Sequence, residues 1–371
     1  MTQEDVKDVT IKNYEPIIGI TQGDPAGVGP EIIAGAWRDL FPAPDEPGSL
    51  ALPPSRPFVF GDPDVIAQGI RLRDVRAHVV PVPADKVAEL ARQYPEIGGP
   101  DMIPVVPCCQ PEVANIVLGQ ISPEGGEAAY RSLNRAIDLA LAHEIDAIVT
   151  APLHKESLNL AGRHYPGHTE ILAERCGVKD FGMALYLGPC RALASPTGLG
   201  VVHVTLHTSM RNALEEVTRQ NVFEKIGLIR RFMRAILKKE PKIGVCALNC
   251  HSGDGGLFGD EEITTIAPAI RDAQRAGAVV AGPFPADTLF LDAKNGRFDG
   301  IVAIYHDQGH IAVKMLDMFG AVNVALGLPI IRTSVAHGTA FNIAGKGIAK
   351  TTSLIEATRI ATLFAEQGLT P

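Results

Sequence analysis

Three histidines, each in a short loop after an apolar run, have the spacing and type to hold a metal ion. They are His207 in VTLHTSM, His251 in LNCHSGDGG and His306 in YHDQGH. The apolar runs before them are expected strands: residues 199–205, 243–249 and 301–305. Ligands of open α/β sheets bind at the carboxyl ends of strands, and three imidazoles with an open fourth position describe a catalytic divalent-metal site. One such histidine alone would more often stabilise its loop, but three together favour the metal.

A second set of side chains suits an anionic substrate. The loop YPGHTE offers His168 and Thr169 at a helix start, where a phosphate or carboxylate can bind, although His168 could equally cap that helix. Lys314 and Asn323, which follow the His306 loop, are further candidates for binding the substrate. The simpler alternative for Lys314 is a lysine exposed to solvent with no ligand. Arg332 lies inside the apolar run LGLPIIRTSV, so its charge is expected to have a partner or a ligand.

The glycine-rich motif GDPAGVGPE, residues 23–31, comes directly after an expected strand at residues 17–21. Its glycines allow backbone amides to approach a ligand, and the helix start that follows favours anions. A structural turn between strand and helix is an equally good interpretation. The spacing GxGxxG of the dinucleotide fingerprint is absent from the chain, so a Rossmann-type cofactor site is not expected.

The composition is that of a globular, cytoplasmic protein. Of 371 residues, 46% are hydrophobic and 20% are charged. The net charge of -8 argues against nucleic acid as a partner, and no apolar run reaches the length of a membrane span. The N-terminus has no signal-peptide pattern, and residues 1–14 are expected to form a disordered tail. The six cysteines show neither zinc nor disulfide spacing and are expected to be reduced thiols.

Apolar runs alternate with amphipathic stretches along the chain, which predicts an α/β fold with largely parallel sheets. The clearest strands are residues 17–21 and 147–150. Ser122, Pro123 and Glu124 have the pattern of a helix start, with an N-cap, a proline and an early acid. The length favours two domains.

The segment 337–349, HGTAFNIAGKGIA, resembles the adenine-binding loop of the isocitrate and isopropylmalate dehydrogenase superfamily. That superfamily binds a nicotinamide cofactor without the GxGxxG fingerprint. The resemblance implies a cofactor-binding set of His337, Gly338, Thr339, Ala340 and Asn342. Asn342 stands where members that use NAD have an Asp that binds the ribose hydroxyls. We expect NAD as the cofactor. NADP stays the open alternative, because Asn lacks the negative charge with which an Asp repels the 2′-phosphate of NADP.

Taken in order, GDPAGVGPE, PGHTE, the three histidine loops, PADTLF and LGLPIIRTSV followed by HGTA resemble the 4-hydroxythreonine-4-phosphate dehydrogenase family of vitamin B6 synthesis. The resemblance implies two α/β/α domains around a central cleft: residues 15–150 plus 310–371 on the cofactor side, and residues 151–309 for substrate, metal and dimerisation. It implies a homodimer whose active site is shared across the interface. It also implies one divalent ion (Zn, Mn, Co or Mg) on His207, His251 and His306, and a substrate held by His168, Thr169, Lys314, Asn323 and Arg332.

The expected reaction is the NAD-dependent and metal-dependent oxidation, with decarboxylation, of a phosphorylated β-hydroxy acid. A general base removes the proton of the substrate hydroxyl, and Lys314 and Asp307 are the candidates. Asp287 of PADTLF could orient either of them.

Several residues depart from the vitamin B6 pattern. Ala336 stands where the family has Asp, Asp254 replaces a Glu, and His310 replaces an apolar residue. The segments HYPGHTEIL and YHDQGHI resemble a second branch of the family, which acts on the 4-phosphates of threonate and erythronate. A further relative oxidises carboxylated cis-dihydrodiols such as that of terephthalate, which carry no phosphate. The intact anion-binding set favours a phosphorylated substrate, 4-phosphohydroxy-L-threonine or a 4-phospho-threonate or erythronate. A metal-dependent metabolite-binding protein without catalysis is the alternative of another class.

Overall fold

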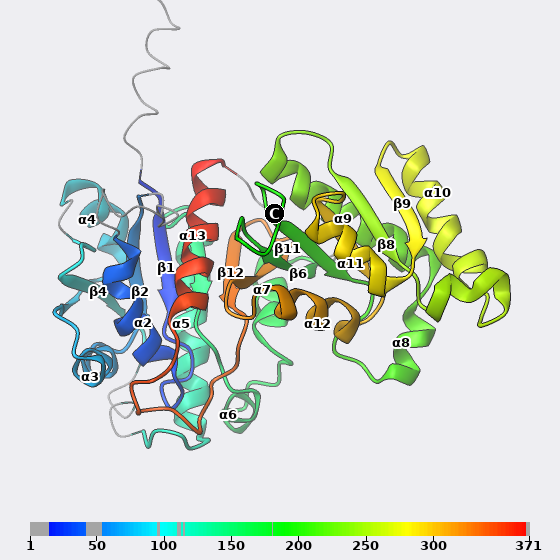
Figure 1. Cartoon of the computed structure of the whole chain (residues 1–371). Helices are drawn as coiled ribbons and strands as arrows, with labels where there is room; N and C mark the ends of the chain where they lie inside the picture. Colours follow the sequence, from blue (N-terminus) through cyan, green and yellow to red (C-terminus); the bar gives the residue numbers. More distant parts are fainter. Residues whose placement is uncertain are drawn as a thin grey trace, which may run out of the picture. The chain divides into compact units, whose positions relative to one another are not determined.

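The computed structural model describes residues 15–41, 54–94, 97–109, 113, 116–179 and 181–368. The tail expected at residues 1–14 lies outside these described residues. The chain divides into two compact units (Figure 1). Unit 1 comprises Met1–Lys179 and Leu328–Thr370, and unit 2 comprises Asp180–Gly327 with Pro371.

Unit 1 contains six parallel strands in the order β3-β4-β2-β1-β5-β12. Their bounds are β1 Ile17–Thr21, β2 Arg56–Gly61, β3 His78–Pro81, β4 Met102–Pro107, β5 Ala147–Thr150 and β12 Ile331–Val335. Strands β1 and β5 have the bounds that the sequence predicts, and every residue in both is buried. Parallel strands covered on both faces carry apolar side chains throughout, which explains why these runs are recognisable in the sequence.

Helices cover the unit 1 sheet, with α13 against β12 and β5 and with α5 against β2 and β1 (Figure 1). The α-helices are α2 Gly29–Ala36, α3 Pro63–Arg73, α4 Val87–Gln93, α5 Pro123–Leu141, α6 Lys155–Leu160, α7 His168–Cys176 and α13 Thr352–Glu366. Helix α5 begins as predicted, because the Ser122 side chain accepts a hydrogen bond from the Gly125 N–H and Pro123 occupies the first turn.

Unit 2 contains six strands in the order β11-β6-β7-β10-β8-β9. They are β6 Gly182–Leu187, β7 Leu199–His203, β8 Lys242–Cys246, β9 Val279–Phe284, β10 Gly300–Ala303 and β11 Ala321–Leu326. Strand β6 runs antiparallel to both β7 and β11, while β7, β10, β8 and β9 are mutually parallel neighbours. The carboxyl ends of β7, β8 and β10 therefore lie at one edge, and each is followed by one of the three histidine loops.

The helices of unit 2 are α8 Met210–Glu216, α9 Arg219–Leu237, α10 Ala267–Arg275, α11 Ala286–Lys294 and α12 His306–Leu316. Helix α9 packs on β7 and β10, and α11 packs on β8. The mixed α/β class that the sequence predicts is confirmed. None of the helices among the described residues is long and apolar enough to cross a membrane.

Two segments belong to units other than those expected from the sequence. Residues 151–179 belong to unit 1, because α6 and α7 pack on α5. Residues 310–327 belong to unit 2, because α12 packs on β7 and β11 pairs with β6 along its whole length. Both assignments follow from long-range packing, which local sequence patterns do not reveal.

Candidate functional site

Arg332 is a buried charge in unit 1. It lies on β12, beside β5, and is only 3% exposed. Its Nε and Nη2 atoms donate hydrogen bonds to the Thr150 hydroxyl, at 3.2 and 2.6 Å. Burial lowers the pKa of Arg332 to about 10, against the opposing charge of Glu170. A guanidinium held among strands in this way is costly to bury, and its bond to a neutral hydroxyl leaves it suited to an anionic ligand.

His168 lies close to Arg332 and is the first residue of α7. Burial and the Arg332 charge hold the pKa of His168 well below its ordinary value, against a hydrogen bond with the Ala151 backbone. The ring is therefore neutral at physiological pH. Thr169 follows it in the first turn of α7, where Gly167 supplies no side-chain cap for the helix amides. The structure thus brings the predicted residues His168 and Arg332 together in unit 1, and Thr169 is the next residue of α7.

His306 is the first residue of α12, and its ring is oriented by the neighbouring carboxylate. The Nδ1 atom of His306 lies 2.7 Å from Oδ1 of Asp307. When Nδ1 carries the proton for this bond, Nε2 presents its lone pair outward, which is the arrangement of a metal-binding imidazole with a carboxylate behind it. The ring of His207 lies 5.9 Å from that of His306. Asp307 is thereby engaged with His306, which leaves Lys314 as the simpler candidate base.

Two further histidines, absent from the predicted site, pack against His306. His310, one turn along α12, stacks on His306 with ring centroids 3.7 Å apart and planes 11° apart. His203, at the end of β7, lies with Nε2 3.2 Å from Nδ1 of His310. Burial and the neighbouring histidines lower the pKa values of His203 and His310 to about 3 and about 4. The spacing of four residues from His306 to His310, one helical turn, is the sequence signal that could have revealed part of this cluster.

Gly309 makes this close packing possible. A Cβ atom at residue 309 would lie 2.3 Å from Nε2 of His203 and 3.1 Å from the Val201 side chain. His203 is only 2% exposed and has little room to move away. A glycine between the DQ and H of YHDQGH is therefore needed for the histidine cluster to form.

His251 lies in a loop after β8 whose residues adopt left-handed backbone angles, with φ of 51° at His251. The carboxylate of Glu262 anchors the start of this loop. Oε1 of Glu262 accepts hydrogen bonds from the N–H groups of Leu248 and Asn249, both at 2.8 Å, and Oε2 accepts one from the Asn249 side chain at 3.0 Å. Glu262 is 3% exposed and is a supporting residue that sequence reasoning missed.

Glu262→Ala should destabilise unit 2 and loosen the His251 loop. The substitution leaves two backbone N–H donors without their acceptor, and each such loss costs about 1–3 kcal/mol. Urea unfolding measures the loss of stability, and hydrogen exchange of residues 248–256 measures the loosening. An exchange rate equal to that of the wild type would contradict this role.

The same carboxylate predicts a pH dependence. Burial alone would raise the pKa of Glu262, but hydrogen bonds from Asn249 and from the loop backbone outweigh burial and lower it. A carboxylate with a lowered folded-state pKa contributes its full stability above its unfolded pKa and loses it as pH falls through the folded value. Acidification below the ordinary carboxylate range should therefore destabilise the wild type more than the Glu262→Ala variant.

The remaining predicted residues of unit 2 lie on three different elements. Lys314 is on α12, two turns after His306 and on the same side of the helix, close enough for its charge to lower the pKa of His310. Asn323 is on β11. Asp287 is on α11, where its carboxylate accepts a hydrogen bond from the Thr288 N–H. The predicted role of Asp287 in orienting a base stays a prediction.

The predicted metal site is incomplete in this chain. Across the described residues, no three His, Cys, Asp or Glu side chains are gathered so that they could hold a metal ion. His207 and His306 are near each other, and His251 is exposed on its own loop. The donor chemistry of the three imidazoles suits zinc. Metal binding by His207, His251 and His306 therefore stays a prediction.

The predicted cofactor loop packs on the glycine-rich motif within unit 1. The Val28 N–H donates to the Thr339 carbonyl at 3.0 Å, and the Glu31 carboxylate accepts hydrogen bonds from the Gly345 and Ala349 N–H groups at 2.9 and 3.1 Å. Gly27 allows this contact, because a Cβ there would lie 2.9 Å from the Thr339 carbonyl oxygen. The motif GDPAGVGPE thus supports the loop that carries His337, Gly338, Thr339, Ala340 and Asn342. The side chain of Asn342 is exposed and available to a ligand.

The chain is similar to several dehydrogenases over nearly its whole length. A D-threonate 4-phosphate dehydrogenase of Salmonella typhimurium is 40% identical, over 94% of this chain and 98% of the relative. The crystal structure of a 4-hydroxythreonine-4-phosphate dehydrogenase from Klebsiella pneumoniae is 37% identical with a TM-score of 0.77, over 95% of this chain and all of that one. A terephthalate 1,2-cis-dihydrodiol dehydrogenase from Burkholderia xenovorans is 27% identical with a TM-score of 0.60, over 94% of this chain and 98% of that one.

These proteins are dehydrogenases, and the chain is an oxidoreductase of the type that acts on CH–OH groups. Residues 54–361 match the family described as pyridoxal phosphate biosynthetic protein PdxA, and the chain belongs to that family. The resemblance stated from the sequence motifs is thereby confirmed. A dehydrogenase of this family uses a nicotinamide cofactor.

Proposed function

We propose that this protein oxidises a phosphorylated β-hydroxy acid with NAD and releases carbon dioxide, and that D-threonate 4-phosphate is its preferred substrate. Buried Arg332 with its neighbours His168 and Thr150 is the observation that carries the proposal. This buried cluster suits the phosphate group of such an acid, and the Arg332 guanidinium can hold the phosphate through two parallel hydrogen bonds. The Salmonella relative is named for D-threonate 4-phosphate, which supports this choice among phosphorylated acids.

The residues of the chain supply binding, orientation and proton transfer. The guanidinium of Arg332 and the imidazole of His168 hold the substrate anion, assisted by the Thr169 hydroxyl. Lys314 takes the proton of the substrate hydroxyl as general base, and Asn323 donates a hydrogen bond to the substrate. Asp307 orients the imidazole of His306.

Two groups that the family implies would complete the chemistry. Bound NAD would accept the hydride from the substrate carbon, with the loop of His337, Gly338, Thr339, Ala340 and Asn342 holding its adenosine part. A divalent ion (Zn, Mn, Co or Mg) would polarise the substrate hydroxyl, with His207, His251 and His306 as its proposed ligands. We further propose a cytoplasmic homodimer in which residues of both subunits complete the site.

A comparison of substrates tests this function. NADH formation is measured at 340 nm, with added divalent metal, for D-threonate 4-phosphate, D-erythronate 4-phosphate, 4-phosphohydroxy-L-threonine and the terephthalate cis-dihydrodiol. We expect the highest kcat/KM for D-threonate 4-phosphate, with one carbon dioxide released per NADH. Turnover of the dihydrodiol alone would overturn the proposal, and so would tight binding of the phosphorylated acids with no turnover, the behaviour of a metabolite-binding protein.

The dihydrodiol is the second candidate because one structural relative, the Burkholderia xenovorans enzyme, is named for it. The dihydrodiol carries carboxylate but no phosphate, so it would leave part of the Arg332 cluster unmatched. The phosphorylated acid is therefore the stronger candidate.

A further inference from the structure

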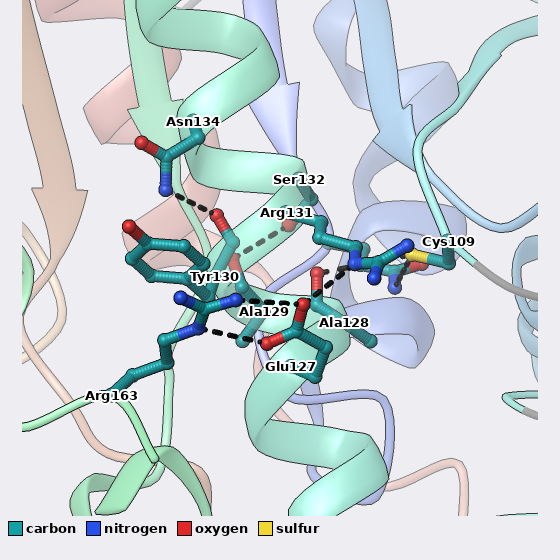
Figure 2. Close-up of polar contacts among 10 residues, drawn as sticks. Cys109, Glu127, Ala128, Ala129, Tyr130, Arg131, Ser132, Asn134 and Arg163 are labelled. Atoms are coloured by element: carbon teal, nitrogen blue, oxygen red, sulfur yellow. Dashed lines mark hydrogen bonds and ion pairs between the residues drawn. The ribbon is translucent and has the colours of Figure 1, made fainter. Parts of the chain in front are cut away.

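The turn that carries His168 and Thr169 is held to helix α5 by a network of side chains on both sides of it. Figure 2 shows part of this network, with Glu127, Tyr130, Arg131 and Arg163 in contact. Glu127, on α5, accepts hydrogen bonds from Nε and Nη2 of Arg163 at 3.0 and 3.2 Å. It also accepts one from Nε of Arg131, one turn further along its own helix, at 2.7 Å. One carboxylate therefore joins two guanidiniums, and one of them comes from the loop before α7.

Aromatic stacking strengthens the same connection. The Arg163 guanidinium lies 4.4 Å from the centroid of the Tyr130 ring, the distance of a cation–π contact. Tyr130 also stacks with Tyr165, with ring centroids 6.1 Å apart and an interplanar angle of 18°. Arg163 and Tyr165 thus both bind to α5 just before the turn.

A second pair of contacts follows the turn. Tyr165 donates a hydrogen bond from its hydroxyl to Glu174 of α7 at 3.1 Å. Arg175, the next residue of α7, donates to the side chains of Asn134 and Asp138 on α5. The segment 163–175 is consequently attached to α5 before and after His168 and Thr169.

The turn itself has little apolar burial to fix its position. His164 and Pro166 are exposed, Tyr165 and Gly167 are only half-buried, and α7 begins without a side-chain cap. Segments with few buried apolar contacts depend on polar and stacking contacts for their order. Displacing a substrate-holding group by about 1 Å can cost on the order of 100-fold in rate or affinity.

We infer that Glu127 is a positioning residue, which through Arg163 and Tyr130 sets the place of the His168–Thr169 turn relative to buried Arg332. This inference rests on the proposed anion-binding role of that turn. Glu127 does not itself contact the substrate anion. Because an anion bound by the turn is held equally in the ground state and the transition state, loosening the turn raises KM and leaves kcat nearly unchanged.

Two variants isolate this connection, and a third is its control. Glu127→Gln removes the charge that joins the two guanidiniums. Arg163→Met removes the guanidinium through which the loop before α7 binds Glu127. Glu124→Gln makes the same change as Glu127→Gln one turn earlier on α5; Glu124 is exposed and lines the same surface hollow of about 630 Å³ as Glu127 and Arg163. The double variant Glu127→Gln with Arg163→Met completes a mutant cycle.

Hydrogen exchange of residues 161–176, measured without any ligand, tests the connection itself. We expect exchange about tenfold faster in Glu127→Gln and Arg163→Met, no further increase in the double variant, and wild-type exchange in Glu124→Gln. Equal exchange in all four variants and the wild type would overturn the inference. This readout holds whether or not the proposed function is correct.

Calorimetric titration with inorganic phosphate, and KM for D-threonate 4-phosphate, test the consequence. We expect the affinity for phosphate to fall about tenfold and KM to rise by a similar factor in Glu127→Gln, while kcat changes by less than about twofold. Faster exchange with unchanged phosphate affinity, or a fall in kcat and thermal stability at unchanged KM, would show a purely structural network and overturn the positioning role. A wild type that binds no phosphate would instead refute the proposed anion site, with the exchange data still deciding the connection.

Discussion

Arg332→Met should lower kcat/KM for a phosphorylated substrate by about 100-fold or more. Arg332 is a buried cation whose hydrogen bonds go to the Thr150 hydroxyl, so an anionic substrate gains its main charged partner there. Truncating one partner of a buried, hydrogen-bonded charge pair costs about 2–5 kcal/mol. Steady-state kinetics with D-threonate 4-phosphate measures the effect, and Arg332→Lys, which keeps the charge without the planar fork, should lose less.

Stability separates this loss from unfolding. Burial lowers the pKa of Arg332 to about 10, which shows that the folded protein holds the charged form at a cost. Replacing a buried charge by an apolar side chain of similar length is often neutral or stabilising, so the thermal midpoint of Arg332→Met should equal or exceed that of the wild type. Arg297→Met, at an exposed arginine paired with Asp292, should leave kcat/KM unchanged. Wild-type kcat/KM in Arg332→Met would refute the anion-binding role.

His251→Ala should remove activity and bound metal while the fold stays intact. His251 is exposed at the surface of its loop, and Glu262 anchors that loop through Leu248 and Asn249, so no packing is lost with the imidazole. Loss of groups that only support a metal ligand already costs about 10–100-fold in metal affinity, and loss of a ligand should exceed that. Metal analysis after dialysis and NADH formation measure the two losses.

The control is His78→Ala, at an exposed histidine of β3 in unit 1, which should retain metal and turnover. Circular dichroism and thermal unfolding of His251→Ala should match the wild type. Removal of metal from the wild type with a chelator should reproduce the inactivity of the variant, and added zinc or manganese should restore only the wild type. Retained turnover with unchanged metal content in His251→Ala would eliminate the three-histidine site.

Much of the fold was accessible from local sequence. The apolar runs at residues 17–21 and 147–150 are strands with the predicted bounds, because strands covered on both faces need uninterrupted apolar residues. The start of α5 at Ser122 and Pro123 was likewise predicted from capping preferences. Arg332, a charge in an apolar run, was expected to have a partner, and the structure supplies Thr150.

The sequence by itself determined the α/β class, the family, the strand-end placement of the three histidine loops and the burial of Arg332, because each depends on local patterning or on motif order. Only the tertiary structure decided which distant residues meet. Thr150 is 182 residues from Arg332, His203 is 107 from His310, and Arg163 is 36 from Glu127. Such pairings depend on strand order and helix packing, which bring remote segments together and leave no periodic trace in the residues between them.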